Sequence, residues 1–170
     1  ARFVEEGWSI KRMLRLMATS EAFRQSSRQP PPSAAKSIFS PFAVRRLEAE
    51  SIRDAILFVS GQMDPTMFGP SVNGKSTRRS LYVRTQRNNL DPLLSVFDAP
   101  EPNATRGVRD ATNVPAQSLM FLNDPWIAGR ARRWAERISR DPTLANDEAR
   151  VARMYGVSLG RPPEAVAAIL

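Results

Sequence analysis

Asp-Pro dipeptides recur along the chain and constrain its fold more than any other feature of the sequence. The Asp side chain accepts hydrogen bonds from the free N–H groups of a first helical turn, and Pro fixes the φ of that turn. We therefore expect helices to begin at three of these pairs and a short turn to begin at a fourth. The helix starts are Asp91-Pro92, Asp124-Pro125 and Asp141-Pro142, and the turn is at Asp64-Pro65.

Other segments carry helix signals of the same kind. Ser9 is a good N-cap for a helix that follows it, and Ser40-Pro41 opens a helix over about 42–60, for which Gly61 is the stop. Further helices are expected over 115–123, 125–140 and 147–159, whereas 79–85 is the one convincing strand-like stretch. The expected fold is mainly α: an irregular helical domain with long ordered loops and at most one small β-hairpin.

The pattern divides the chain into three parts. We expect a helical segment over 1–25 that continues from a missing N-terminal part, so that the chain is a piece of a longer protein. Residues 26–40 are rich in Pro and Ser and indicate a linker. Residues 41–170 form the helical domain, with a braced loop at 97–125 that is long for a compact domain.

Composition narrows the chemistry. The 170 residues contain no Cys and no His, which excludes a thiolate metal site and a His-dependent triad within this chain. No apolar run approaches a membrane span, so we expect no membrane insertion. The net charge of +8 comes almost entirely from Arg and favours an anionic partner, or simply solvated faces and internal ion pairs.

One stretch imitates a phosphate-binding loop. Residues 69–76 fit G-x-x-x-x-G-K-[ST], with Gly69, Gly74, Lys75 and Ser76 at the motif positions. A working loop of this kind needs a buried strand before it and a helix starting at its Lys-Ser end. Neither is expected here, so we interpret the match as chance and expect no cofactor in this chain.

Charged residues on the expected 42–60 helix form a candidate site. Glu50, Arg53 and Asp54 lie on one face with Arg46. Paired carboxylates could act as acid and base or bind Ca²⁺, or they could belong to an ion-pair lattice on the surface. No metal site is assigned to them.

The loop at 97–125 supplies the remaining candidates. It is either a polar binding surface or a braced connector, in which Arg106 and Arg109 pair with Asp98 or Asp110, and Gln117 and Asn123 satisfy loop carbonyls. The candidate residues of this segment are Asp98, Asn103, Arg109, Gln117, Asn123 and Asp124.

Several long motifs occur in order along the chain. They are FVEEGWSIKRMLRLMATSEAFRQSS, RRLEAESIRDAILFVSGQMDPTMFGPSV, RRSLYVRTQRN, PLLSVFDAPEPNATRGVRDATNVPAQSLMFLNDP and YGVSLGRPP. On these motifs the chain resembles the planctomycete-type C-terminal domain of unknown function, found in large exported proteins that often also carry cytochrome-c-like domains. The segment RQPPPSAAKSIFSPFAV and Glu101 depart from the pattern of that family.

The resemblance implies a periplasmic or cell-surface location and a multidomain parent tied to electron transfer or polysaccharide handling. Any haem would belong to another domain, because this chain has no Cys-x-x-Cys-His. The resemblance also implies that a set of charged and polar residues recurs in the family: Glu50, Arg53, Asp54, Arg79, Asp98, Asn103, Gln117, Asn123 and Asp124. It implies no reaction.

Three functions remain open from the sequence. The first is an interaction or scaffold module whose partners are other domains of the parent, with a glycan or another anionic polymer as a further partner. The second is a hydrolase acting on glycans through Glu50, Asp54 and Asp98, and the third is a binder of nucleic acid or polyanion. We also predict that Arg53, Asp54 and Arg79 contact the 97–113 loop.

Overall fold

The computed structural model describes residues 2–25, 44–103, 105 and 107–163. Contacts divide the chain into two compact units, Ala1–Arg46 and Leu47–Leu170. The whole of the expected linker at 26–40 and the helix start at Ser40-Pro41 lie outside the described residues.

The described part of the first unit holds two short helices, α1 (Arg2–Glu5) and α2 (Ile10–Thr19). The turn between them uses Gly7 and Trp8, both at positive φ, and the Trp8 ring meets the Phe3 ring edge-on at 5.3 Å. Ser9 caps α2 as expected, since its hydroxyl accepts a hydrogen bond from the Arg12 N–H.

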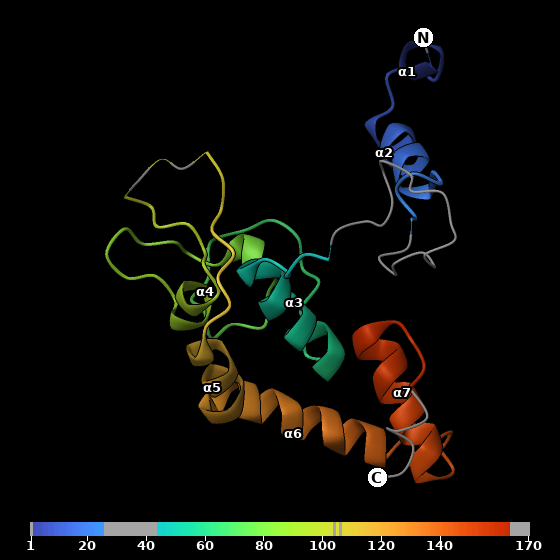
Figure 1. Cartoon of the computed structure of the whole chain (residues 1–170), viewed down its shortest axis with the longest axis vertical. Helices are drawn as coiled ribbons and strands as arrows, with labels where there is room; N and C mark the ends of the chain where they lie inside the picture. The colour runs from blue at the N-terminus through green and yellow to red at the C-terminus, as the bar shows by residue number, and fades with distance from the viewer. Residues whose placement is uncertain (1, 26–43, 104, 106, 164–170) are drawn as a thin grey trace, which may run out of the picture. The chain divides into compact units, whose positions relative to one another are not determined.

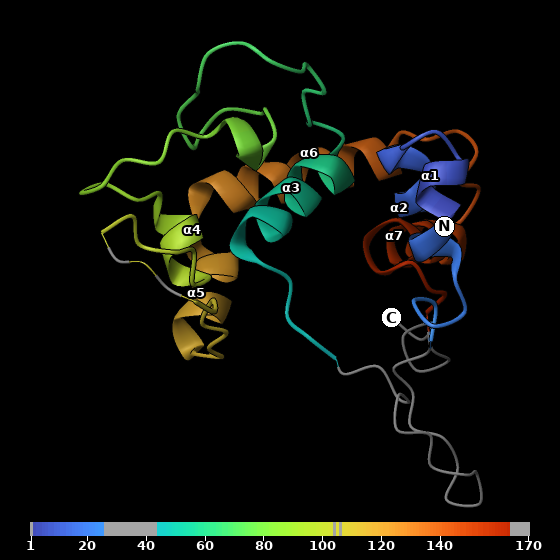
Figure 2. The same ribbon diagram turned by 90° about the horizontal axis from the view of Figure 1, so that it is seen from above.

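The second unit contains five α-helices and a 3₁₀ turn in its described part (Figure 1). They are α3 (Ala49–Ser60), η1 (Ser80–Tyr82), α4 (Pro92–Val96), α5 (Pro115–Asn123), α6 (Pro125–Ser139) and α7 (Asp147–Leu159). Helix α3 contacts α4, η1, α6 and α7, and Figure 2 shows it running beside α6. The described residues form no strand, only isolated β-bridges, so the mainly α fold is confirmed.

Three expected elements are wrong. The helix expected from residue 42 begins only at Ala49, after an extended stretch. The strand-like segment 79–85 instead contains η1, whose Tyr82 N–H donates to Arg79 O at 2.9 Å. Asp141-Pro142 starts a turn, because the Asp141 carboxylate is bound by Thr143, and α7 begins later behind Asn146.

The apolar core lies where α3, α4 and α6 meet. Its buried members are Ala49, Val83, Leu93, Leu94, Phe97 and Ile127. The core-facing side of α3 also contains two polar residues, Arg53 and Ser60. Thus a helix face that the sequence pattern assigns to a polar stripe is partly inside the protein.

The end of α3 is fixed by a close approach of another helix. Gly61 ends α3 in a left-handed conformation, as expected. Arg137 of α6 donates to the Val59 carbonyl at 2.6 Å, and a Cβ on Gly61 would lie 2.0 Å from the Arg137 guanidinium. The left-handed φ favours glycine here, and any larger residue would also require the Arg137 guanidinium to move.

Candidate functional site

Arg53 is the most deeply buried charged residue of the described chain, with only 1% of its surface exposed. Its guanidinium donates to Arg78 O at 2.9 Å and to Gly74 O at 3.0 Å, and also to Ser76 O. A further bond runs to the Ser80 hydroxyl at 3.3 Å. One cation therefore gathers the carbonyls of a whole loop, which offsets the cost of burying its charge.

This loop is the one whose letters imitate a phosphate-binding motif. A phosphate cradle turns backbone N–H groups inward toward an anion. Here the carbonyls of Gly74 and Ser76 point inward toward a cation, while Lys75 is exposed. The loop ends in a 3₁₀ turn rather than in an α-helix. The polarity of the loop is therefore the reverse of what a phosphate requires.

Arg78 organises the neighbouring segment in the same way, although the sequence analysis did not single it out. It donates to the carbonyls of Thr66 and Pro70, each at 3.1 Å, and to that of Phe68. Its guanidinium lies over the Tyr82 ring at 4.0 Å, and the Tyr82 hydroxyl accepts from the Phe68 N–H at 2.8 Å. The available signal was an arginine beside a Gly- and Pro-rich loop whose carbonyls need donors.

The result is an apolar tip with its polar groups turned inward. Met67 and Phe68, which we call the tip, are 64% and 77% exposed. Phe68 also has a φ of 64°, which is unusual for a bulky residue and costs about 1–2 kcal/mol. Bonds to Arg78 and Tyr82 hold this conformation.

Asp54, a candidate carboxylate, binds the backbone of η1. One of its oxygens accepts from the Ser80 N–H and from the Ser80 hydroxyl, both at 2.7 Å. The exposed Arg79 lies 3.7 Å from the other oxygen. Asp54 thus fixes η1, which follows the loop held by Arg53.

Glu50 forms a two-pronged ion pair with Arg109 of the 97–114 loop, with distances of 2.8 and 3.0 Å. The hydrogen bond from Arg109 lowers the pKa of Glu50, and the same bond raises the pKa of Arg109. Glu48 is a second partner of Arg109, at 3.3 Å. The expected pairing of Arg109 with Asp98 or Asp110 is therefore wrong, and Arg106 lies outside the described residues.

Asp98 and Gln117 brace the same loop through hydrogen bonds to Thr112. The Asp98 carboxylate accepts from the Thr112 N–H at 2.8 Å and from its hydroxyl. Gln117 is 5% exposed and donates to the carbonyls of Val96 and Thr112 at 3.2 and 3.1 Å. Gln117 thus satisfies loop carbonyls, as the braced interpretation predicts.

The remaining candidates bond elsewhere, although Asp124 lines a cavity of about 130 Å³ together with Arg53 and Lys75. Asn103 donates to the Arg87 carbonyl at 3.4 Å, and Asp124 caps α6 by accepting from Trp126 and Ile127. Asn123 is exposed at the end of α5. The structure therefore does not bring these three residues together with Glu50 and Asp54.

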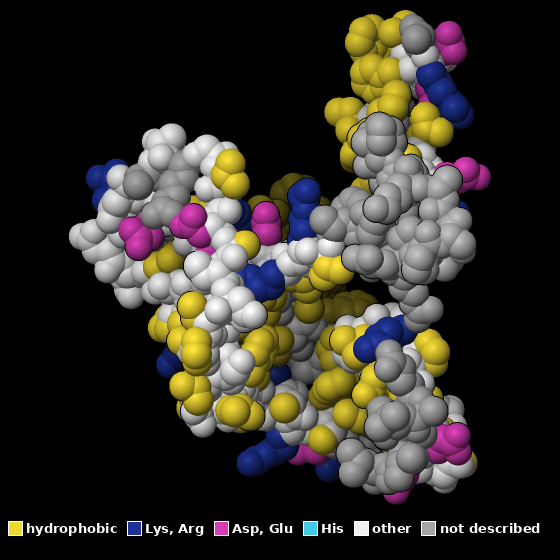
Figure 3. Space-filling model, in the orientation of Figure 1, with side chains coloured by type: hydrophobic (Ala, Val, Ile, Leu, Met, Phe, Trp, Pro, Cys, Tyr) yellow, Lys and Arg dark blue, Asp and Glu magenta, His cyan; other side chains and the backbone are white. Residues whose placement is uncertain are grey.

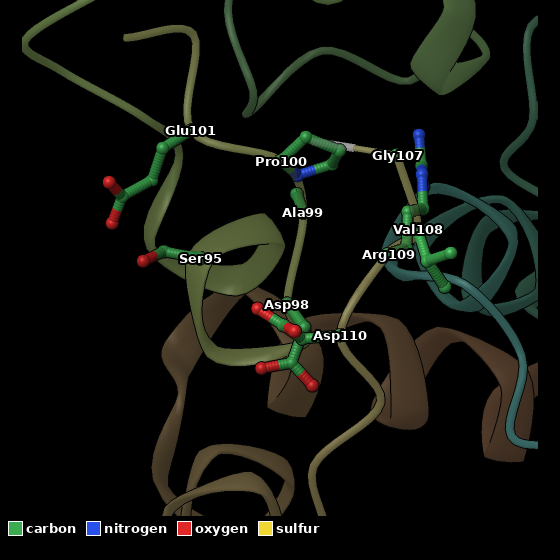
Figure 4. Close-up of a pocket in the computed structure, with 9 residues that line it drawn as sticks. All are labelled: Ser95, Asp98, Ala99, Pro100, Glu101, Gly107, Val108, Arg109 and Asp110. Atoms are coloured by element: carbon green, nitrogen blue, oxygen red, sulfur yellow. The ribbon is translucent and has the colours of Figure 1, made fainter. Parts of the chain in front are cut away.

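Two neighbouring cavities lie along the 97–114 loop. One, of about 450 Å³, is lined by Glu50, Asp54 and Arg79 and by Arg109 of the loop, so Asp54 and Arg79 share a cavity with the loop. Arg53 instead donates to the Arg78 carbonyl. Direct contact of these residues with the loop stays a prediction. The other, of about 300 Å³, is lined by Asp98, Glu101 and Asp110 (Figure 4). Figure 4 also shows the Arg109 side chain directed away from Asp98 and Asp110.

Of the three carboxylates of the hydrolase hypothesis, Glu50 and Asp54 thus share one cavity, as that hypothesis requires of two of them, and Asp98 lines the other. In the described part of the chain, no group of three or more Asp, Glu, His or Cys side chains is arranged to hold a metal ion. Within the same residues, no helix has the length and apolar character needed to cross a membrane.

The fold and this network define a helical domain whose long loops are held by arginine. The chain belongs to the PSD1 family of proteins of unknown function (DUF1553), whose family model matches residues 1–168. The resemblance to a domain of unknown function is therefore confirmed. Neither the curated proteins nor the solved structures yielded a match.

Proposed function

We propose that this chain is an interaction module of an exported multidomain protein, in which the charged candidates shape loops and do no chemistry. One observation carries the proposal: Glu50, Arg53 and Asp54 each bind a loop of their own chain. Their atoms are engaged in fixing the backbone, so the polar network is best understood as a brace.

The hydrolase hypothesis fits this geometry less well. Glycoside hydrolysis needs one carboxyl group that is protonated near neutral pH, and such a group has a raised pKa. The pKa of Glu50 is instead lowered by the bond from Arg109. Asp54 accepts two short hydrogen bonds from Ser80, which leaves it poorly placed to move a proton.

The hydrogen bonds of Arg78 and Tyr82 hold the exposed tip of Met67 and Phe68 in a fixed conformation. A rigid, exposed aromatic side chain loses little entropy on binding and is a common anchor at protein interfaces. The same stretch of the chain carries further exposed cations, Lys75, Arg79 and Arg84. The module would therefore contact an apolar, acidic surface on another domain of the parent protein.

Calorimetry between this chain and the separately produced remainder of the full-length protein tests the proposal. We expect binding that is weakened about tenfold or more by Phe68→Asn, since Asn tolerates the left-handed conformation but lacks the ring. Leu122→Asn, which removes another exposed side chain, is the matched control and should bind as the unaltered chain does.

A second experiment addresses catalysis. The chain is incubated with neutral and acidic oligosaccharides, and new reducing ends are measured beside the thermal midpoint at low and moderate salt. The proposal predicts no turnover and no salt-resistant rise of the midpoint. Turnover that is abolished by Glu50→Gln would contradict it and restore the hydrolase.

A further inference from the structure

We propose that Asn73-Gly74 is a self-modifying site, at which the folded chain converts the Asn73 amide to a carboxylate faster than a flexible peptide of the same sequence does. This inference goes beyond the proposed function and does not depend on it. The pair lies in the loop that Arg53 holds, and Asn73 is exposed. On the face drawn in Figure 3, the loops of the second unit present mainly backbone and uncharged polar groups to solvent.

The reaction needs only groups of the chain and water. The Gly74 nitrogen attacks the Asn73 Cγ, so that a new C–N bond forms and the bond from Cγ to Nδ2 breaks. The proton of the Gly74 N–H leaves with the amide nitrogen as ammonia, and a cyclic imide remains. Water then opens the imide at either of its carbonyls, which gives aspartate or isoaspartate. Nothing is oxidised or reduced.

The nucleophile is accessible. Among the described residues, the Gly74 N–H donates to no acceptor, and glycine has no side chain that would shield it. The packing of the loop favours glycine here, because a Cβ would lie 1.8 Å from the Asp91 carboxylate. Asn73-Gly74 is also the only Asn-Gly pair of the sequence. The packing that excludes a side chain thus leaves the backbone nitrogen open to reaction.

The fold also activates the electrophile. The Asn73 Oδ1 accepts a hydrogen bond from the Lys75 N–H at 3.0 Å. Negative charge develops on this oxygen when Cγ is attacked, so the donor stabilises the transition state as an oxyanion hole does. A second bond, from the Ser76 N–H to the Asn73 carbonyl at 3.1 Å, fixes the turn that holds the donor. A flexible peptide would make these bonds for only part of the time.

The product should disturb the loop. Isoaspartate adds a methylene group to the main chain just before Gly74, whose carbonyl accepts from Arg53 at 3.0 Å. A carboxylate at position 73 also meets a like charge, because Asn73 and Asp91 line the same cavity, of about 960 Å³. The modified chain should therefore lose part of the stability that Arg53 provides.

Mass spectrometry tests the proposal on this chain and on a synthetic peptide of residues 69–78, kept in the same mildly alkaline buffer. Water labelled with heavy oxygen marks each new carboxylate, and proteolytic fragments report the rate at Asn73. We expect the Asn73 amide to be lost at least about tenfold faster in the chain than in the peptide. Asn73→Gln should abolish the change at this position.

Two variants at the next position test the donor. Lys75→Ala retains the backbone N–H and should retain the faster rate. Lys75→Pro lacks the N–H and should react only as fast as a peptide with the same substitution, while its thermal midpoint shows that the chain is folded.

An equal or slower rate in the unaltered chain than in the peptide would overturn the inference, because the fixed loop would then hold Gly74 away from Asn73. Slow reaction of Lys75→Ala, or fast reaction of folded Lys75→Pro, would overturn it as well, because the N–H of residue 75 would not be the activating donor.

Discussion

Two long loops of this protein are held in different ways. Residues 61–79 are fixed from within, because the buried guanidinium groups of Arg53 and Arg78 donate hydrogen bonds to carbonyls along the loop. Residues 97–114 are fixed mainly near the surface, by the half-exposed pair of Glu50 and Arg109 and by the bonds of Asp98 to Thr112 within the loop. Their buried donor is the neutral amide of Gln117.

The difference shows how a loop without strands can be ordered. Carbonyls that would pair in a sheet must find donors elsewhere if they are buried. A guanidinium carries five donors in a planar fork, so one arginine can serve several carbonyls at once. An exposed ion pair adds far less, because water screens it. The first loop should therefore depend on single residues much more than the second.

The largest expected effect is from Arg53→Met. It leaves the carbonyls of Gly74, Ser76 and Arg78 without their donor inside the protein. We expect the free energy of unfolding to fall by about 3–5 kcal/mol, measured by urea denaturation. Arg132→Met changes an exposed arginine of α6 and should cost less than about 0.5 kcal/mol. Equal effects of the two substitutions would show that Arg53 is not a brace.

Gly74→Ala is expected to have the next largest effect. A Cβ at this position would lie 1.8 Å from the Asp91 carboxylate, which caps α4 through the N–H groups of Leu93 and Leu94. Moving Asp91 breaks the cap, so we expect a loss of about 1–3 kcal/mol in a thermal or urea titration. Gly129→Ala, in open space within α6, should instead stabilise by about 0.5–1 kcal/mol. Stabilisation by both would contradict the close packing of this loop.

Phe68→Gly should stabilise the protein. It removes a side chain that is exposed and relieves the left-handed strain at this residue. Glycine also raises the entropy of the unfolded chain, so the net gain is at most about 1 kcal/mol. The same change should weaken binding at the tip, and a loss of stability would show that the Phe68 ring packs against its own loop.

Glu50→Gln tests how much the ion pair with Arg109 stabilises the 97–114 loop. Because the folded-state pKa of Glu50 is lowered from its ordinary 4.5, the pair stabilises above that pH and the effect is lost as pH falls through the lowered pKa. We expect the difference in urea midpoint between the two proteins to shrink below pH 4.5. At neutral pH, Glu50→Gln should lower the free energy of unfolding by no more than about 1 kcal/mol. Glu101→Gln, which removes a carboxylate from the exposed part of the same loop, controls for the change of charge alone.

Sequence patterns located the helices well where a cap acts locally. Asp124-Pro125 begins α6 as predicted, because the Asp side chain binds the first N–H groups of the helix itself. Asp141-Pro142 carries the same letters and makes the same bond to the N–H two residues on, but the Thr143 hydroxyl also binds the carboxylate and the next helix begins only behind Asn146. The motif alone therefore does not decide where a helix begins.

The site was harder to predict, because it depends on partners far apart in the sequence. A polar stripe on α3 gives no sign that Arg53 is buried, since its partners lie 21 to 27 residues away in an irregular loop. Arg109 likewise bonds to Glu50, 59 residues distant, and not to the nearer carboxylates. Charge patterns identify which residues take part, and only the fold decides how they pair.

Nuclear magnetic resonance of the arginine side chains tests the central claim most directly, with Arg53→Lys to assign the signals. A guanidinium fixed by several carbonyls rotates slowly and is shielded from solvent. The account predicts separate, slowly exchanging Nη signals for Arg53 at neutral pH, and averaged signals for the exposed Arg132. Averaged, rapidly exchanging signals from Arg53 would show that it does not hold the loop, and the polar residues around it would again be open to a role in binding or catalysis.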